Sequence, residues 1–158
     1  MIETSLEVDA VDRAIAGSLH LDGAVLPMLH AIQDELGYVP GFATDRIAEA
    51  LNLSRAEIYG VVTFYHDFRS TPPGRHVVKV CRAEACQAMG ADALVDHMKQ
   101  RLGCDFHETS PSSAGSVTLE PVYCLGNCAV GPSLSIDGKL HGRVTKERFD
   151  DLAKTELG

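Results

Sequence analysis

The residues best suited to chemistry in this 158-residue sequence are four of its five cysteines, which form two closely spaced pairs. Cys81 and Cys86 have four residues between them, and Cys124 and Cys128 have three. Thiolates are soft, anionic metal ligands, so such pairs in a reducing compartment indicate metal binding or redox chemistry rather than a disulfide framework. Four thiolates are the ligand set of a [2Fe–2S] cluster. The spacing therefore favours one [2Fe–2S] cluster and single-electron transfer, with no catalytic residue.

Four other interpretations compete with this one. A structural zinc site also uses four cysteines, but zinc ribbons usually place two residues between ligands. A thiol oxidoreductase needs the Cys-x-x-Cys motif, which the sequence lacks. A Rieske centre needs two histidines, and none of the seven lies within either cysteine loop. Buried structural thiols are the fourth possibility. The main rival from a different class is a zinc-stabilised interaction module.

The fifth cysteine and three glycines complete the candidate site. Cys104 follows Gly103 and has no close partner in the sequence, so we expect a free thiol rather than a fifth ligand. Gly90, Gly126 and Gly131 lie beside or within the cysteine pairs. Because glycine has no side chain, we expect it to let backbone N–H groups approach the cluster sulfurs closely.

The second half of the chain must position the cysteines. Its expected elements are a strand over 76–80 that runs into Cys81, a helix over 91–102, a loop over 105–115, a strand over 116–122, a hairpin over 134–144 with a type I′ turn at Asp137-Gly138, and a helix capped by Thr145. This β-α-β-β-α order resembles a thioredoxin-like fold. Each cysteine pair follows a predicted strand, so both pairs can meet at one end of a sheet.

The first half shows apolar residues at helical spacing instead. Three stripes indicate helices: Val25, Met28, Leu29, Ile32 and Leu36; Ile47, Ala48 and Leu51; Ile58, Val61, Val62 and Tyr65. Ser54 and Glu57 form a capping-box pattern before the third stripe, and residues 8–19 predict an earlier helix. The pattern changes at the break over 70–74. We therefore expect an α+β chain with an N-terminal helical bundle over 1–73 and a thioredoxin-like [2Fe–2S] domain over 74–158.

Composition excludes several function classes. The net charge is −8 with only 14 lysines and arginines, which argues against a nucleic-acid partner. No apolar run approaches the roughly 20 residues of a membrane span. The N-terminal residues are acidic, unlike a secretory signal, so we expect a cytoplasmic protein.

Several motifs carry a family resemblance. The segments Gly37-Tyr38-Val39-Pro40, Ile47-Ala48 with Leu51, and Gly60-Val61-Val62-Thr63-Phe64-Tyr65, followed by both cysteine pairs, resemble the thioredoxin-like [2Fe–2S] ferredoxin subunit of respiratory NADH:quinone oxidoreductase, the "24 kDa" subunit family. The likeness covers nearly the whole chain. The run over 66–69 and the Cys-Arg-Ala-Glu-Ala-Cys loop are most similar to the gamma subunit of NAD-dependent molybdenum formate dehydrogenase.

The resemblance implies a place in a larger complex. Cys81, Cys86, Cys124 and Cys128 would be the ligands of one [2Fe–2S] cluster, near a partner subunit that binds FMN and NAD and carries further iron–sulfur clusters. A molybdenum-containing formate-oxidising subunit would complete a formate dehydrogenase. The alternatives are the equivalent subunit of respiratory NADH:quinone oxidoreductase or of an NAD-reducing hydrogenase.

The same resemblance implies an interface with that partner. The helical half has more apolar stripes than it has sequence to bury them. We therefore expect some of Phe42, Ile58, Val62 and Tyr65 to pack against a partner subunit.

Overall fold

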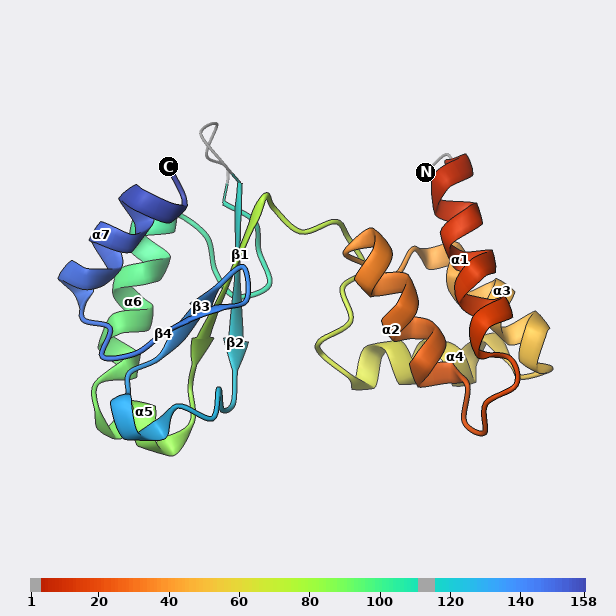
Figure 1. Ribbon diagram of the computed structural model, residues 1–158, viewed down its shortest axis with the longest axis horizontal. Helices are drawn as coiled ribbons and strands as arrows, with labels where there is room; N and C mark the ends of the chain where they lie inside the picture. The colour runs from red at the N-terminus through yellow and green to blue at the C-terminus, as the bar shows by residue number, and fades with distance from the viewer. Residues whose placement is uncertain (1–3, 111–115) are drawn as a thin grey trace. The chain divides into compact units, whose positions relative to one another are not determined.

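The structure, a computed structural model, describes residues 4–110 and 116–158. The chain divides into two compact units, Met1–Pro72 and Pro73–Gly158, the helical unit and the sheet unit (Figure 1). The mixed α+β class predicted from the sequence is confirmed. Part of the predicted loop over 105–115, residues 111–115, lies outside the described residues.

The helical unit contains the helices that the apolar stripes predict: α1 (Ser5–Ser18), α2 (Val25–Leu36), α3 (Gly41–Leu51) and α4 (Arg55–Phe64). α1 begins before the predicted residue 8 because Thr4 and Glu7 form a capping box that the sequence analysis did not use. Gly37 ends α2 in the left-handed conformation with φ 82°, which glycine adopts without strain. The stripe residues of α2 and α3 form the core of the unit.

The third apolar stripe is only partly buried, and its last residue, Tyr65, lies outside the helix that the stripe predicts. Ile58 is the fully buried residue of α4, while Val61 and Val62 are half-buried against the core. Tyr65 lies beyond the last helical residue with extended backbone, because α4 ends at Phe64. Its side chain is 44% exposed. The end of α4 therefore presents an aromatic surface rather than a buried face.

The capping box at Ser54 gives a prediction for the stability of the helical unit. Ser54 Oγ accepts a hydrogen bond from Glu57 N (3.2 Å), and the Glu57 carboxylate accepts one from Ser54 N (2.8 Å). Ser54→Ala is expected to lower the free energy of unfolding by about 1 kcal/mol, because it leaves a helix N–H unpaired. Urea unfolding followed by circular dichroism measures the change. Arg55→Ala, which removes an exposed ion pair with Asp45, is the control and should change stability by less than about 0.5 kcal/mol.

The sheet unit contains β1 (His76–Cys81), β2 (Val117–Val122), β3 (Leu134–Ile136) and β4 (Lys139–His141), in the spatial order β2-β1-β3-β4. β1 and β2 are parallel, and the other neighbouring pairs are antiparallel. Helices α6 (Ala91–Leu102) and α7 (Lys146–Glu156) cover one face of the sheet (Figure 1). Alternate strand residues pack against them in one core that includes Val78, Val80, Leu119, Leu134, Met98 and Phe149.

Three details differ from the expected elements. A short helix, α5 (Glu84–Ala88), begins inside the first cysteine loop and contains Cys86, where no helix was predicted. The expected loop after Gly103 instead hydrogen-bonds along β2, through His107 N to Leu119 O (2.8 Å) and Ser110 N to Val117 O (2.8 Å). The second hairpin strand ends at His141, not at residue 144. The predicted type I′ turn is present, since both of its central residues have positive φ.

Within residues 4–110 and 116–158, none of the helices combines the length and the apolar character needed to cross a lipid bilayer.

Candidate iron–sulfur site

The two cysteine pairs lie in loops that follow β1 and β2, which are parallel neighbours in the sheet. Cys81 is the last residue of β1, and Cys86 lies in α5. Cys124 comes just after β2, and Cys128 begins the short 3-10 helix η1 (Cys128–Val130). Parallel neighbours point the same way, so both loops lie at the same end of the sheet unit, where α5 is labelled in Figure 1.

The sulfur atoms form a buried pair and an exposed pair. Cys81 and Cys86 are 2% and 1% exposed, and their thiols share a hydrogen bond. Cys124 and Cys128 are exposed to solvent, with their Sγ atoms 3.7 Å apart. Electrostatic interactions link Cys128 to Cys81 and to Cys86. The four thiols predicted as ligands therefore come together at one site, as two pairs.

The surroundings raise the pKa of two of the four site thiols. Burial is the main cause for Cys86; its hydrogen bond with Cys81 adds to the rise in pKa, and a hydrogen bond from the Ser133 N–H opposes it. The hydrogen bond with Cys124 is the main cause of the raised pKa of Cys128, and the nearby charge of Cys124 adds to it. A coordinated metal ion acts in the opposite direction, because it binds the thiolate form.

Ser133, directly before β3, holds the two loops together, although the sequence analysis did not single it out. Its main-chain oxygen accepts a hydrogen bond from Cys81 N (3.0 Å). Its hydroxyl accepts one from Asn127 Nδ2 (3.1 Å), which lies inside the second cysteine loop. Ser133 is buried, so these bonds are shielded from water. Ser133 thus ties the end of β1 to the loop that carries Cys124 and Cys128.

Gly142, directly after β4, is a second support that sequence reasoning missed. A Cβ at this position would lie 2.9 Å from Val130 O and 2.9 Å from Asn127 Nδ2. The next residue, Arg143, donates from its main-chain N to Val130 O (2.6 Å). The sequence signal was a glycine inside the expected hairpin strand, which marks a close approach of two backbone segments.

The three glycines singled out in the sequence play different parts. Gly126 has φ 73°, and its N–H donates to Cys124 Sγ (3.3 Å). A Cβ on Gly131 would lie 3.3 Å from Cys86 Sγ, so this backbone covers the buried pair. Gly90 has no atom within 4 Å of a Cβ position and instead precedes α6 with φ 91°. The Gly90 N–H donates to Gln87 O (2.9 Å), so the structure does not support the expected approach of this N–H to a cluster sulfur.

Cys104 lies in the hydrophobic core of the sheet unit, away from the site. Its Sγ is 3.9 Å from Val117 O, and its side chain is buried. Burial raises the pKa of its thiol, with the charges of Glu108 and Asp105 adding to the rise. These surroundings favour the predicted free thiol over a fifth ligand.

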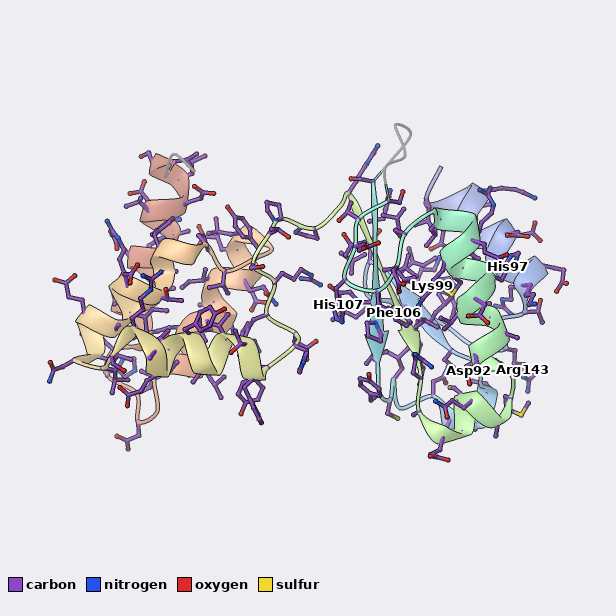
Figure 2. The ribbon with its side chains drawn as sticks, turned by 180° about the vertical axis from the view of Figure 1, so that it is seen from behind. Asp92, His97, Lys99, Phe106, His107 and Arg143 are labelled. Carbon is purple, nitrogen blue, oxygen red and sulfur yellow. The ribbon has the colours of Figure 1, made fainter. Side chains whose placement is uncertain are left out.

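The side chain of Arg82, next to Cys81, stabilises the first cysteine loop through contacts with other segments. Arg82 Nη2 lies 3.0 Å from Asp92 Oδ1 on α6, and its guanidinium carbon lies 5.5 Å from the centre of the Phe106 ring. Lys99 Nζ approaches the same ring to 4.3 Å (Figure 2). These contacts connect the loop to α6 and to the segment that follows it.

Arg82→Ala is therefore expected to destabilise the sheet unit without changing the reduction potential of the cluster. The lost ion pair and cation–π contact should cost about 1 kcal/mol of unfolding free energy. The reduction potential of the cluster should hardly move, because the Arg82 charge is already paired with Asp92. Urea unfolding and redox titration of the same samples measure both quantities, with the exposed Lys154→Ala as control. A clear drop in the reduction potential at unchanged stability would instead show that the Arg82 charge stabilises the reduced cluster.

The donor set suits a two-iron cluster. In a [2Fe–2S] centre with four cysteine ligands, each iron takes two thiolates. The site offers its thiols as two pairs, with amide N–H groups directed at Cys124 and Cys86. Among the described residues, no three His, Cys, Asp or Glu side chains are arranged to hold a single metal ion. The paired thiols and their amide donors fit a [2Fe–2S] cluster.

Fold and site together define an iron–sulfur electron carrier built on a thioredoxin-like sheet. The chain belongs to the thioredoxin-like [2Fe–2S] ferredoxin family, whose profile matches residues 11–156. Its cofactor is one [2Fe–2S] cluster. The family and the cofactor predicted from the sequence are both confirmed.

Relatives from different complexes resemble the chain over most of its length. It is 37% identical over 131 residues to a subunit of the NADH-quinone oxidoreductase of Pseudomonas aeruginosa, covering 83% of this chain and 76% of the relative. It is 32% identical over 124 residues to a subunit of the NADP-reducing hydrogenase of Solidesulfovibrio fructosivorans, covering 78% and 71%.

A crystal structure of an NAD+-reducing [NiFe]-hydrogenase in the air-oxidized state shares the fold. Its TM-score is 0.65 at 23% identity, and the match covers 82% of this chain. The chain spans about a fifth of the hydrogenase chain, with 22% covered.

Proposed function

We propose that Cys81, Cys86, Cys124 and Cys128 hold the [2Fe–2S] cluster and that the chain passes single electrons inside an NAD-linked complex. The observation that carries the proposal is the meeting of four free thiols, as two pairs, at one end of the sheet. When bound there, the cluster supplies one-electron chemistry. The chain positions the ligands and directs amide N–H groups at their sulfurs. Catalysis of a two-electron reaction belongs to other subunits.

The names of the relatives support two parent complexes. They are NADH:quinone oxidoreductase and a hydrogenase that reduces NAD or NADP. The molybdenum-dependent formate dehydrogenase expected from the sequence has less support, since it rests on the run over 66–69 and on the Cys81–Cys86 loop. All three complexes imply a partner subunit that binds FMN and NAD and carries iron–sulfur clusters.

Purified protein separates the electron carrier from a zinc-stabilised interaction module. Anaerobically prepared chain should be red-brown and contain about two irons and two sulfides. Dithionite should add one electron and produce the paramagnetic signal of a half-reduced pair. Colourless, zinc-loaded protein obtained under the same precautions would contradict the proposal.

Co-purification identifies the parent complex. A tagged chain expressed in its source is expected to recover a subunit that binds FMN and NAD. Recovery of quinone-reducing membrane subunits would indicate the respiratory enzyme, and a hydrogen-activating subunit would indicate a hydrogenase. A molybdenum-containing subunit would restore the formate dehydrogenase hypothesis. Recovery of the chain alone would contradict the subunit proposal and leave the cluster assignment untouched.

The exposed aromatic end of α4 is the surface we assign to the partner. Phe64, the last residue of α4, is 72% exposed, and its ring meets that of Tyr65 edge to face with centroids 5.0 Å apart. Tyr59, in the middle of the same helix, is 60% exposed. Exposed aromatic clusters are typical of protein interfaces. Of the residues expected there, Tyr65 suits this role; Ile58 does not, because the unit's own core buries it completely.

Phe64→Ala with Tyr59→Ala should reduce recovery of the flavin subunit several-fold while leaving the cluster intact. Leu6→Ala, at an equally exposed apolar residue on α1, is the matched control. If both variants recover equally little flavin subunit, α4 is not part of the interface.

Two further points belong to the same proposal. We assign the helical bundle over 1–73 and the [2Fe–2S] domain over 74–158 as separate domains. We also expect the complex in the cytoplasm, because cysteine ligands must remain reduced until iron binds them.

A further inference from the structure

The buried and the exposed cysteine pair differ in their access to small oxidants. Cys81 and Cys86 are almost completely buried, and the Gly131 backbone lies against Cys86 Sγ. Thiol–disulfide exchange requires a thiolate to reach the sulfur of its reaction partner, so a buried thiol reacts slowly. Cys124 and Cys128 have no such cover, since both are exposed. A dissolved disulfide can therefore reach only the second pair without opening the fold.

The exposed pair also has the geometry to react with itself. The Sγ atoms of Cys124 and Cys128 lie 3.7 Å apart, and a disulfide bond closes this distance to about 2.05 Å. The residues between them lie outside the strands of the sheet. Gly126, in their middle, adopts φ 73°, which turns the chain back on itself. Joining the two sulfurs therefore requires side-chain rotation and an adjustment of this loop, and leaves the strands in place.

We propose that Cys124 and Cys128 are a redox modification site, at which a small organic disulfide of the glutathione type converts the cluster-free chain to an intraloop disulfide that blocks cluster insertion. The inference rests on the proposed function, because it takes these two sulfurs as iron ligands. It assigns the exposed pair a second chemistry, used only before the cluster is in place.

The reaction balances as two exchange steps. One cysteine thiolate attacks the small disulfide, whose S–S bond breaks as one small thiolate leaves. The second cysteine then attacks the resulting mixed disulfide, and the other small thiolate leaves. The cysteine pair loses two electrons, which the small disulfide gains, and the two cysteine protons pass to the two released thiols. Excess small thiol reverses both steps.

The consequence is a control on cluster assembly. An oxidised chain offers iron only the two buried thiols, so one iron of the pair lacks its protein ligands. The buried pair stays reduced and able to bind iron, because the small disulfide cannot reach buried sulfurs. Assembly therefore stops when the surrounding disulfide level rises and resumes when thiols recover. The core contacts of the sheet unit are untouched, since the reacting loop lies outside that core.

The 158-residue chain, free of cluster and carrying Cys104→Ser, tests the inference, because it contains only the four site cysteines. It is treated anaerobically with glutathione disulfide, free thiols are alkylated after unfolding, and peptides are mapped by mass spectrometry. The expected product has one disulfide between Cys124 and Cys128, with Cys81 and Cys86 both alkylated. A Cys81–Cys86 disulfide, a cross-link between the pairs, a stable mixed disulfide or no reaction would each overturn the inference.

Reconstitution with iron and sulfide, without added thiol, supplies the second measurement. Oxidised chain is expected to take up at least ten-fold less cluster than reduced chain, and dithiothreitol should restore uptake. Equal uptake by both forms would contradict the block even if the predicted disulfide is mapped. If reduced chain takes up no cluster, the proposed function itself fails, whatever the mapping shows. The two failures are therefore distinguishable.

Discussion

Replacing any one of Cys81, Cys86, Cys124 and Cys128 by serine is expected to weaken cluster binding severely or to change its spectrum. A serine oxygen is a harder donor than a thiolate and suits iron in this cluster less well. The native protein should bind about two irons per chain, and each single variant should bind clearly less iron. Iron and sulfide analysis, visible absorption and the paramagnetic signal after dithionite reduction measure the effect.

Cys104→Ser is the matched control for this series. Cys104 packs in the core of the sheet unit, with its Sγ 3.9 Å from Val117 O. Its replacement should leave iron content and spectrum unchanged and cost only a modest part of the folding stability. The ligand assignment would be wrong if this variant lost its cluster while one of the other four kept a native one.

Gly142→Ala is expected to disturb the site although the residue touches no ligand sulfur. The new Cβ would lie 2.8 Å from Val130 Cγ2 and 2.9 Å from Val130 O, closer than a methyl group can pack. The Val130 side chain can rotate, but its backbone oxygen also accepts the Arg143 hydrogen bond. The segment that begins at Cys128 must therefore shift. Overpacking of this kind costs about 1–3 kcal/mol.

Two measurements on the same sample check the Gly142 prediction. Urea unfolding should show the lower stability of the sheet unit, and the rate of iron loss to a chelator should rise, because the Cys128 loop is displaced. Gly60→Ala is the control: its Cβ position in α4 meets no atom within 4 Å, so the helix should gain about 0.5–1 kcal/mol. A Gly142 variant as stable as the native chain, with unchanged iron loss, would show that the loop has room to adapt.

The strand and helix pattern of both units was predictable from local physics. Clustered β-branched residues predicted β1 up to Cys81, and Asp137-Gly138 predicted the hairpin turn. The capping box at Ser54 predicted the start of α4. Each of these signals lies within a few neighbouring residues, so no tertiary information is needed to interpret it. The missed helix α5 spans five residues, too short to show a clear period.

The sequence resemblance identified the family but not the parent complex. Short motifs near Cys81 favoured a formate dehydrogenase, whereas the relatives over most of the chain bear the names of an NADH-quinone oxidoreductase and a hydrogenase. One electron-carrying subunit serves several complexes when the site needs only to hold its cluster. We propose that these complexes differ at the partner surface, which we assign to the exposed end of α4, and not at the cluster loops.

The sequence alone therefore determined the element types, the family and the four cysteines that make a [2Fe–2S] site plausible, because these follow from residue type and local spacing. Only the tertiary structure showed which residues hold the cysteine loops in place and which cysteine sulfurs are exposed to solvent. Ser133 and Gly142 act on the second cysteine loop through contacts made when β3 and β4 fold beside β1, and no local pattern contains such contacts. Burial of one cysteine pair and exposure of the other have the same cause, because solvent access depends on the segments packed around each sulfur.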